Sequence, residues 1–160
     1  MSRPVIAMMP GAEYGQAKQW PEKNYKELAS ILLDKGYQVW VIGSAKEKEL
    51  GQAVLEGLGK HAVNLCGKTE LVDAVDLLSC AEQVVTNDSG LMHVAAAVGV
   101  KLNVIYGSST PDYTPPLTDA AILHYSNLDC SPCFKRNCPL GHLDCLTGID
   151  ANQVFVKIIQ

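Results

Sequence analysis

Residues 83–106 read QVVTNDSGLMHVAAAVGVKLNVIY and contain one complete strand–helix–strand unit. An apolar run at 83–86 leads into small polar residues. A helical pattern over 91–98 follows, Gly99 ends it, and a second apolar run occupies 102–106. Two strands joined through one helix by short connections are typical of a right-handed βαβ unit with parallel strands. This stretch therefore predicts a parallel sheet with helices packed against it.

The same alternation of apolar runs and helical patterns runs through the rest of the chain. Further strands are predicted at 5–9, 39–42, 62–65 and 121–123, and further helices at 25–35, 46–58, 71–78 and after Asp150, which can cap the last helix. The helix at 71–78 is expected to have Leu71, Val75 and Leu78 on one face. The expected fold is α/β, a Rossmann-like three-layer α/β/α arrangement forming a single domain over residues 1–160.

Size and composition exclude several classes of protein. The 160 residues suit one domain, and 48% hydrophobic against 19% charged residues indicate a folded globular chain. The net charge of -4 argues against a nucleic-acid partner held by a broad basic surface. No apolar run approaches the roughly 18 residues of a membrane span, and residues 1–4 do not begin a signal peptide. A cytoplasmic location is therefore expected, in which the six Cys are reduced thiols or metal ligands.

Four loops follow predicted strands, at 10–21, 43–47, 87–93 and 107–111, and all are rich in Gly and small polar residues. In an open parallel sheet, ligands bind beyond the carboxyl ends of the strands. Because these loops all leave that edge, we expect them to form one binding site.

The segment 87–93 is the most informative of these loops. Asp88 or Ser89 can cap the helix that follows, and Ser89 and Gly90 can present backbone N–H groups to a phosphate. His93 lies one turn further on and can face the same pocket. The alternative is that the segment is only a helix cap and that His93 is a half-buried structural residue.

Two charged residues in the other loops suit a phosphorylated ligand. Lys18 can neutralise a diphosphate, although a solvated surface Lys is the common alternative. Glu47 can accept hydrogen bonds from sugar or ribose hydroxyls, or can merely complement the dipole of its own helix.

The loops and their flanking residues resemble glycosyltransferase family 9, the heptosyltransferases. The resemblance runs from about residue 5 to residue 158, with four motifs in the family's order. They are PGAEYGQAKQWP at 10–21, VIGSAKE at 41–47, VTNDSGLMHVAAA at 85–97 and YGSSTPDYTPP at 106–116.

This resemblance implies the fold and the activity. The fold would be the C-terminal, nucleotide-sugar-binding half of a GT-B glycosyltransferase, with the N-terminal acceptor domain and its Asp general base absent from an excised domain or fragment. The reaction would be inverting transfer of L-glycero-D-manno-heptose from ADP-heptose to the inner core of lipopolysaccharide. It would need no metal and no cofactor. It would take place at the cytoplasmic face of the inner membrane, with which the full-length enzyme would make peripheral contact. The donor-binding residues would be Gly11, Lys18, Gly43, Ser44, Glu47, Thr86, Asp88, Ser89, Gly90, Met92, His93 and Gly107.

A cysteine-rich loop at about 126–148 stands apart from these motifs. Cys130 and Cys133 form a C-x-x-C pair, and four thiolates with Cys138 and Cys145 could hold zinc or an iron–sulfur cluster. The spacing to the last two Cys is irregular, and C-x-x-C alone is a modest signal, so we expect reduced thiols near the cleft rather than a metal site.

Three alternative functions stay open on the residues alone. One is another nucleotide-sugar transferase of the same family, and another is a metal-stapled binding module without transferase activity. The third, a dinucleotide-dependent oxidoreductase, is disfavoured because no G-x-G-x-x-G follows the first strand.

Overall fold

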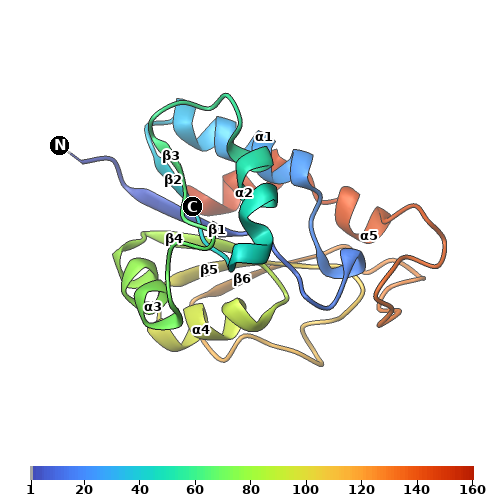
Figure 1. The fold of residues 1–160 in the computed structure, drawn as a ribbon. Helices are drawn as coiled ribbons and strands as arrows, with labels where there is room; N and C mark the ends of the chain where they lie inside the picture. Colours follow the sequence, from blue (N-terminus) through green and yellow to red (C-terminus); the bar gives the residue numbers. More distant parts are fainter. Residues whose placement is uncertain (1) are drawn as a thin grey trace.

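A six-stranded, wholly parallel sheet forms the centre of the molecule in the computed structural model, which describes residues 2–160. Its strand order is β3-β2-β1-β4-β5-β6, the order of the Rossmann fold (Figure 1). The strands are β1 (Val5–Met9), β2 (Gln38–Val41), β3 (Ala62–Asn64), β4 (Gln83–Asn87), β5 (Lys101–Tyr106) and β6 (Ala121–Tyr125).

Helices follow every strand except β5, which is joined to β6 by a loop, and they cover both faces of the sheet. The α-helices are α1 (Glu22–Asp34), α2 (Lys48–Leu55), α3 (Leu71–Cys80), α4 (Gly90–Val98), α5 (Asp144–Thr147) and α6 (Ala151–Ile158), with short 3-10 helices η1 (Gln16–Lys18) and η2 (Ala45–Glu47). The predicted α/β fold with a parallel sheet is confirmed, and the sheet reverses its winding between β1 and β4. That reversal is where ligands bind in open α/β sheets.

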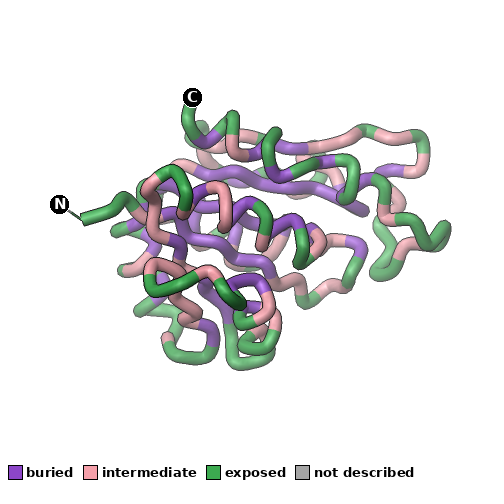
Figure 2. Tube along the Cα trace, turned by 90° about the horizontal axis from the view of Figure 1, so that it is seen from above, coloured by how far each residue is buried: buried purple, intermediate pink, exposed green. Residues whose placement is uncertain are grey.

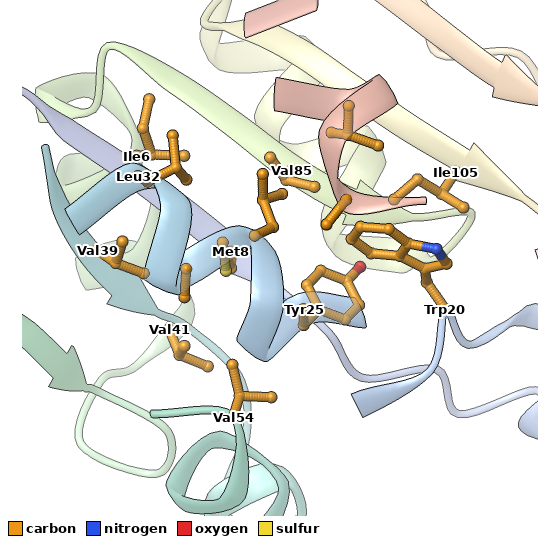
Figure 3. Packing of buried hydrophobic residues seen from close by; sticks show 14 of the residues in the cluster. Ile6, Met8, Trp20, Tyr25, Leu32, Val39, Val41, Val54, Val85 and Ile105 are labelled. Atoms are coloured by element: carbon orange, nitrogen blue, oxygen red, sulfur yellow. The ribbon is translucent and has the colours of Figure 1, made fainter. Parts of the chain in front are cut away.

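Two separate cores fill the spaces between the layers. Because side chains alternate along a strand, Ile6 and Met8 of β1 pack under α1, α2 and α6, whereas Ala7 and Met9 pack under α3 and α4. Figure 2 shows the buried strands running through the middle of the molecule. Trp20, which follows η1, packs edge to face on Tyr25 of α1 with the ring centroids 4.9 Å apart (Figure 3). This contact fixes the end of the first loop on the core.

The structure corrects some local expectations. In α3 the buried residues are Ala74 and Leu78, whereas Leu71 and Val75 are exposed, so of the three residues predicted to share an apolar face only Leu78 packs into the core. The predicted cap of the last helix is confirmed, because the Asp150 side chain accepts a hydrogen bond from the Gln153 backbone N–H. Helix α5 was not predicted. No helix within residues 2–160 combines the length and the apolar character needed to cross a membrane.

Candidate functional site

A cleft of about 580 Å³ opens at the carboxyl edge of the sheet, where the loops after β1, β2 and β4 meet. Its volume falls within the range of about 300–1,000 Å³ that is usual for small-ligand pockets. All but three of the residues predicted to bind the donor line this cleft. They are Gly11, Lys18, Gly43, Ser44, Glu47, Asp88, Ser89, Gly90 and His93.

The three predicted residues outside the cleft are packed inside the domain instead. Thr86 is fully buried in β4, and its hydroxyl donates to the backbone oxygen of Asn87 at 2.9 Å. Met92 is fully buried on the side of α4 that faces the sheet. Gly107 is packed so closely that a Cβ there would lie 2.4 Å from the backbone oxygen of Ala17. These positions were assigned to the site because they belong to the motifs, but their side chains or backbone pack inward.

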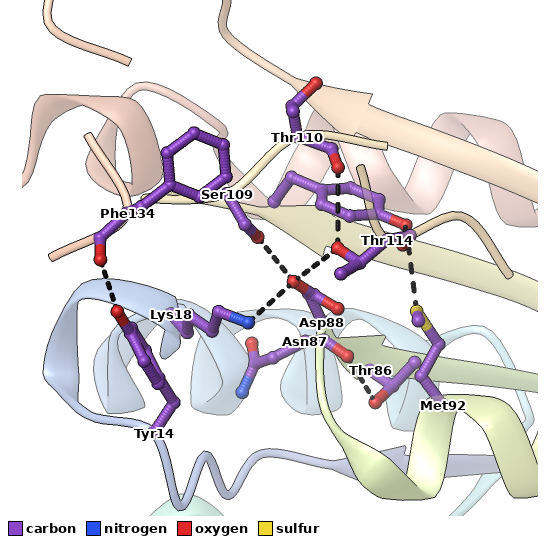
Figure 4. Close-up of polar contacts among 11 residues, drawn as sticks. Tyr14, Lys18, Thr86, Asn87, Asp88, Met92, Ser109, Thr110, Thr114 and Phe134 are labelled. Carbon is purple, nitrogen blue, oxygen red and sulfur yellow. Dashed lines mark hydrogen bonds and ion pairs between the residues drawn. The ribbon is translucent and has the colours of Figure 1, made fainter. Parts of the chain in front are cut away.

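Asp88 is the polar centre of the cleft. Its carboxylate lies 3.0 Å from Lys18 Nζ, accepts a hydrogen bond from Thr114 Oγ1 at 2.9 Å, and accepts another from the Ser109 hydroxyl (Figure 4). Only 4% of the Asp88 side chain is exposed, against 17% for Lys18. A nearly buried carboxylate is therefore matched by one cation and two hydroxyl donors, as buried charge requires.

The expected helix cap is not formed. Ser89 occupies the N-cap position of α4, but among the described residues no side chain makes a capping hydrogen bond there, and Asp88 points to its own partners instead. The N–H groups in the first turn of an α-helix have no partner within the helix. Ser89 and Gly90 line the cleft, so this end of α4 offers uncapped donors and the positive end of its dipole to a ligand.

The glycines of the cleft have two different roles. A Cβ at Gly90 would meet nothing within 4 Å, so this glycine leaves open space in the cleft. A Cβ at Gly11 would lie 2.5 Å from Glu47 Cγ, and one at Gly43 would lie 3.1 Å from Glu47 Cβ. Gly11 and Gly43 therefore let Glu47 approach the first two loops, where its carboxylate accepts a hydrogen bond from the Ser44 hydroxyl.

Asn87, which was not predicted as a site residue, fixes the end of β4 to the first loop of the site. Its side-chain oxygen accepts hydrogen bonds from the Trp20 backbone N–H at 3.0 Å and from the Tyr25 hydroxyl at 2.8 Å. Its side-chain nitrogen donates to the backbone oxygen of Pro10 at 2.8 Å. The residue is fully buried, so the end of β4 and the first loop are fixed to each other. A polar residue at the end of an apolar strand was the available signal.

Ten further residues line the cleft but were not predicted. Six of them lie within the four quoted motifs, and the other four, at 69–74, come from the start of α3 and the residues just before it, which no motif marks. The additional lining residues are Glu13, Tyr14, Ile42, Thr69, Glu70, Leu71, Ala74, Leu91, Val94 and Thr114.

The chemistry of the cleft changes along the sheet edge. Beyond β2, the cleft is lined by Ile42 together with Leu71 and Ala74 of α3. These apolar side chains suit a flat ring. Beyond β1 and β4, Lys18 and the start of α4 suit negative charge. Next to them, Asp88 can accept hydrogen bonds from hydroxyl groups.

The four cysteines of the loop at 126–148 line a separate small void of about 20 Å³ beside Ala17 and Ser108. All six cysteines of the chain are free thiols. Burial raises the pKa of Cys145 to about 11, whereas backbone N–H donors, first that of Leu143, lower the pKa of Cys138. No three His, Cys, Asp or Glu side chains within residues 2–160 converge in a way that could hold a metal ion.

Comparison with known proteins gives the family. The model of glycosyltransferase family 9 (heptosyltransferase) matches residues 1–144. The chain belongs to glycosyltransferase family 9. In this family it is 51% identical over 125 residues to lipooligosaccharide heptosyltransferase 2 of Haemophilus influenzae, covering 76% of this chain and 36% of the relative. It is 50% identical over 123 residues to lipopolysaccharide heptosyltransferase 2 of Escherichia coli, covering 74% of this chain and 35% of the relative.

A solved family 9 structure has the same fold. The ADP-heptose lps heptosyltransferase II of E. coli superposes with a TM-score of 0.86 at 41% identity, over 99% of this chain and 46% of the other. The chain thus spans between about a third and a half of the length of the relatives that it matches. The resemblance to glycosyltransferase family 9 seen in the sequence is confirmed.

Proposed function

We propose that this domain is the donor-binding half of a lipopolysaccharide heptosyltransferase and that its cleft holds ADP-heptose. The observation that carries the proposal is the convergence of Lys18, Asp88 and the uncapped start of α4 in one cleft at the edge where β1 and β4 end. The relatives support the choice of donor, because the solved relative at 41% identity is an ADP-heptose-dependent enzyme by its name.

Each part of the donor has a place in this proposal. The adenosine lies beyond β2, with its base against Leu71 and Ala74 and its ribose hydroxyls donating to Glu47. The diphosphate lies against the backbone N–H groups of Ser89 and Gly90. The heptose lies next to Asp88 and His93, which offer it hydrogen-bonding groups.

Lys18 links the diphosphate and the sugar in this arrangement. Its ammonium group has three donors, one of which is directed at Asp88. The others can reach a phosphate oxygen without breaking the pair. As the bond from the heptose to the diphosphate breaks, charge grows on the departing phosphate, and both Lys18 and the dipole of α4 stabilise that charge.

The complete reaction requires an acceptor and a base. We propose that the acceptor is the inner core of lipopolysaccharide. We further propose that a second domain binds this acceptor and supplies the general base; the relatives are long enough to contain such a domain. The reaction would take place at the cytoplasmic face of the inner membrane, and closure of the two domains would assemble the site.

Calorimetric titration tests the donor proposal. We expect this chain to bind ADP and to bind UDP and NAD⁺ at least tenfold more weakly. All three ligands carry a diphosphate, but uracil is smaller than the adenine assigned to the apolar end of the cleft, and the second nucleoside of NAD⁺ would have to lie where the heptose is placed. Equal affinity for ADP and UDP would point to another nucleotide-sugar transferase of the family. Tightest binding of NAD⁺ would favour the oxidoreductase alternative.

A further inference from the structure

A pair of aromatic side chains lies beside the cleft and has no part in the donor site. Tyr113, in the loop after β5, and Phe134, in the cysteine-rich loop, meet edge to face with ring centroids 5.4 Å apart. They are 73% and 43% exposed. We call these two rings the aromatic pair.

The position of Phe134 is imposed by its surroundings. Its φ of 57° lies in the left-handed region, which is an outlier for so bulky a residue. Its backbone N–H donates to the backbone oxygen of Ser108 at 2.7 Å, and its backbone oxygen accepts a hydrogen bond from the Tyr14 hydroxyl. Strained backbone of this kind persists where neighbouring contacts enforce it, and it is concentrated at ligand sites. The backbone of Phe134 is therefore fixed by its neighbours, and its ring lies at the surface.

The aromatic pair forms one wall of a second hollow of about 500 Å³. Tyr14, Lys18 and Ser109 complete its lining, and Tyr14 and Lys18 also line the donor cleft. Figure 4 shows the Tyr14 hydroxyl directed at the backbone of Phe134, with Ser109 between Phe134 and Asp88. The second hollow thus lies next to the end of the donor cleft where the proposed heptose lies, with Tyr14 and Lys18 bordering both.

The chemistry of this hollow suits a second sugar ring. A pyranose has apolar C–H faces that pack on aromatic rings, and hydroxyl groups around its edge that need polar partners. The aromatic pair offers ring surface, while the Ser109 hydroxyl and Lys18 lie at the inner side. The guanidinium of Arg136, 5.1 Å from the Tyr14 ring centroid, adds positive charge nearby. A nucleotide base already has apolar surroundings at the opposite end of the cleft, beside Leu71 and Ala74.

We propose that the aromatic pair is a stacking platform for the acceptor saccharide, the sugar that receives the transferred heptose. This inference rests on the proposed donor function, because it places the acceptor next to the donor sugar along the same sheet edge. It assigns part of acceptor recognition to this domain, through Tyr113 and Phe134, in addition to the second domain.

Saturation-transfer NMR tests the platform with a defined probe, methyl L-glycero-α-D-manno-heptopyranoside, added to the chain saturated with ADP. We expect the probe to bind to the unchanged protein, and Tyr113→Ala and Phe134→Ala each to weaken this binding about fivefold or more. Tyr113→Phe keeps a ring and should bind normally. Leu117→Ala, which removes a side chain that is 84% exposed in the same loop as Tyr113, should have no effect.

The ADP affinity, measured on the same samples, separates this proposal from the donor proposal. It should stay within about twofold in all four variants. Absence of probe binding to an ADP-loaded protein, or probe binding that survives both alanine substitutions, would overturn the platform and leave the donor site standing. Failure of the unchanged protein to bind ADP would instead refute the donor proposal, and the platform with it.

Discussion

Lys18 Nζ lies 3.0 Å from the Asp88 carboxylate, so the two charges compensate each other before any ligand binds. A diphosphate placed next to Lys18 would share the ammonium group with Asp88. This explains how a cleft in a chain of net charge -4 can attract an anion, because the carboxylate is already matched by Lys18, Ser109 and Thr114.

Replacing Lys18 with Ala should weaken ADP binding about 10- to 100-fold, the worth of a charge-assisted contact of roughly 1.5–3 kcal/mol. Adenosine, which has no phosphate, should bind almost as before. Calorimetry with both ligands measures the difference, and Lys23→Ala on the exposed start of α1 controls for the change in net charge. Equal losses for ADP and adenosine would remove the phosphate role from Lys18.

Gly90→Val should abolish most of the increase in melting temperature that ADP produces. The new side chain has free space, so folding should survive with a helix-propensity change under about 1 kcal/mol, but that space is the proposed phosphate site. Ala97→Val adds bulk to the exposed side of the same helix and should keep the full ADP effect. If Gly90→Val also keeps it, the diphosphate does not lie at the start of α4.

At the scale of elements, the link between β4 and the first loop depends on one buried amide. Asn87→Ala removes the partner of the Trp20 N–H and the Tyr25 hydroxyl, and each unsatisfied buried group costs about 1–3 kcal/mol. We expect urea unfolding to show a loss of about 2–5 kcal/mol. Asn152→Ala, on the exposed side of α6, should change stability little. A loss below about 1 kcal/mol would mean that the loop does not depend on Asn87.

Strand β6 carries a buried histidine that should make stability depend on pH. Burial, with a further contribution from the charge of Lys157, lowers the pKa of His124 from 6.5 to about 4. Between these two pH values the unfolded chain binds more protons than the folded one. The free energy of unfolding should therefore fall as the pH drops from about 6.5 to about 4, by at most about 1.4 kcal/mol per pH unit.

Urea titrations at several pH values, compared between the unchanged protein and His124→Gln, measure this effect. The glutamine keeps a polar group near Asn103, which lies 3.4 Å from His124 Nε2, but does not titrate. Its stability should decline less steeply over that pH range. Identical pH dependence in both proteins would show that His124 does not make this contribution.

At the scale of the whole molecule, the sheet and the edge that carries the site followed from local patterns. Strand β1 matched its prediction at Val5–Met9, and the other strands differ from theirs by one or two residues, because alternating apolar runs and helix stops are local signals. The parallel topology then placed the loops at one edge.

What could not be predicted depends on contacts between distant residues. The cysteine-rich loop is tied to the site by the Ala17 N–H donating to the Arg136 backbone oxygen and by the Phe134 N–H donating to that of Ser108. No periodicity encodes such bonds. For the same reason Asp88 does not cap α4 as the surrounding sequence suggested. Its partners Ser109 and Thr114 come from the loop after β5.

The most direct test of the donor site is a crystal structure of this chain with ADP bound. We predict the diphosphate within hydrogen-bonding distance of the Ser89 or Gly90 backbone N–H and of Lys18 Nζ, with the adenine beside Leu71 and Ala74. ADP bound anywhere else, for example in the hollow between β6 and α6 that Leu123 and Val156 line, would contradict the central claim.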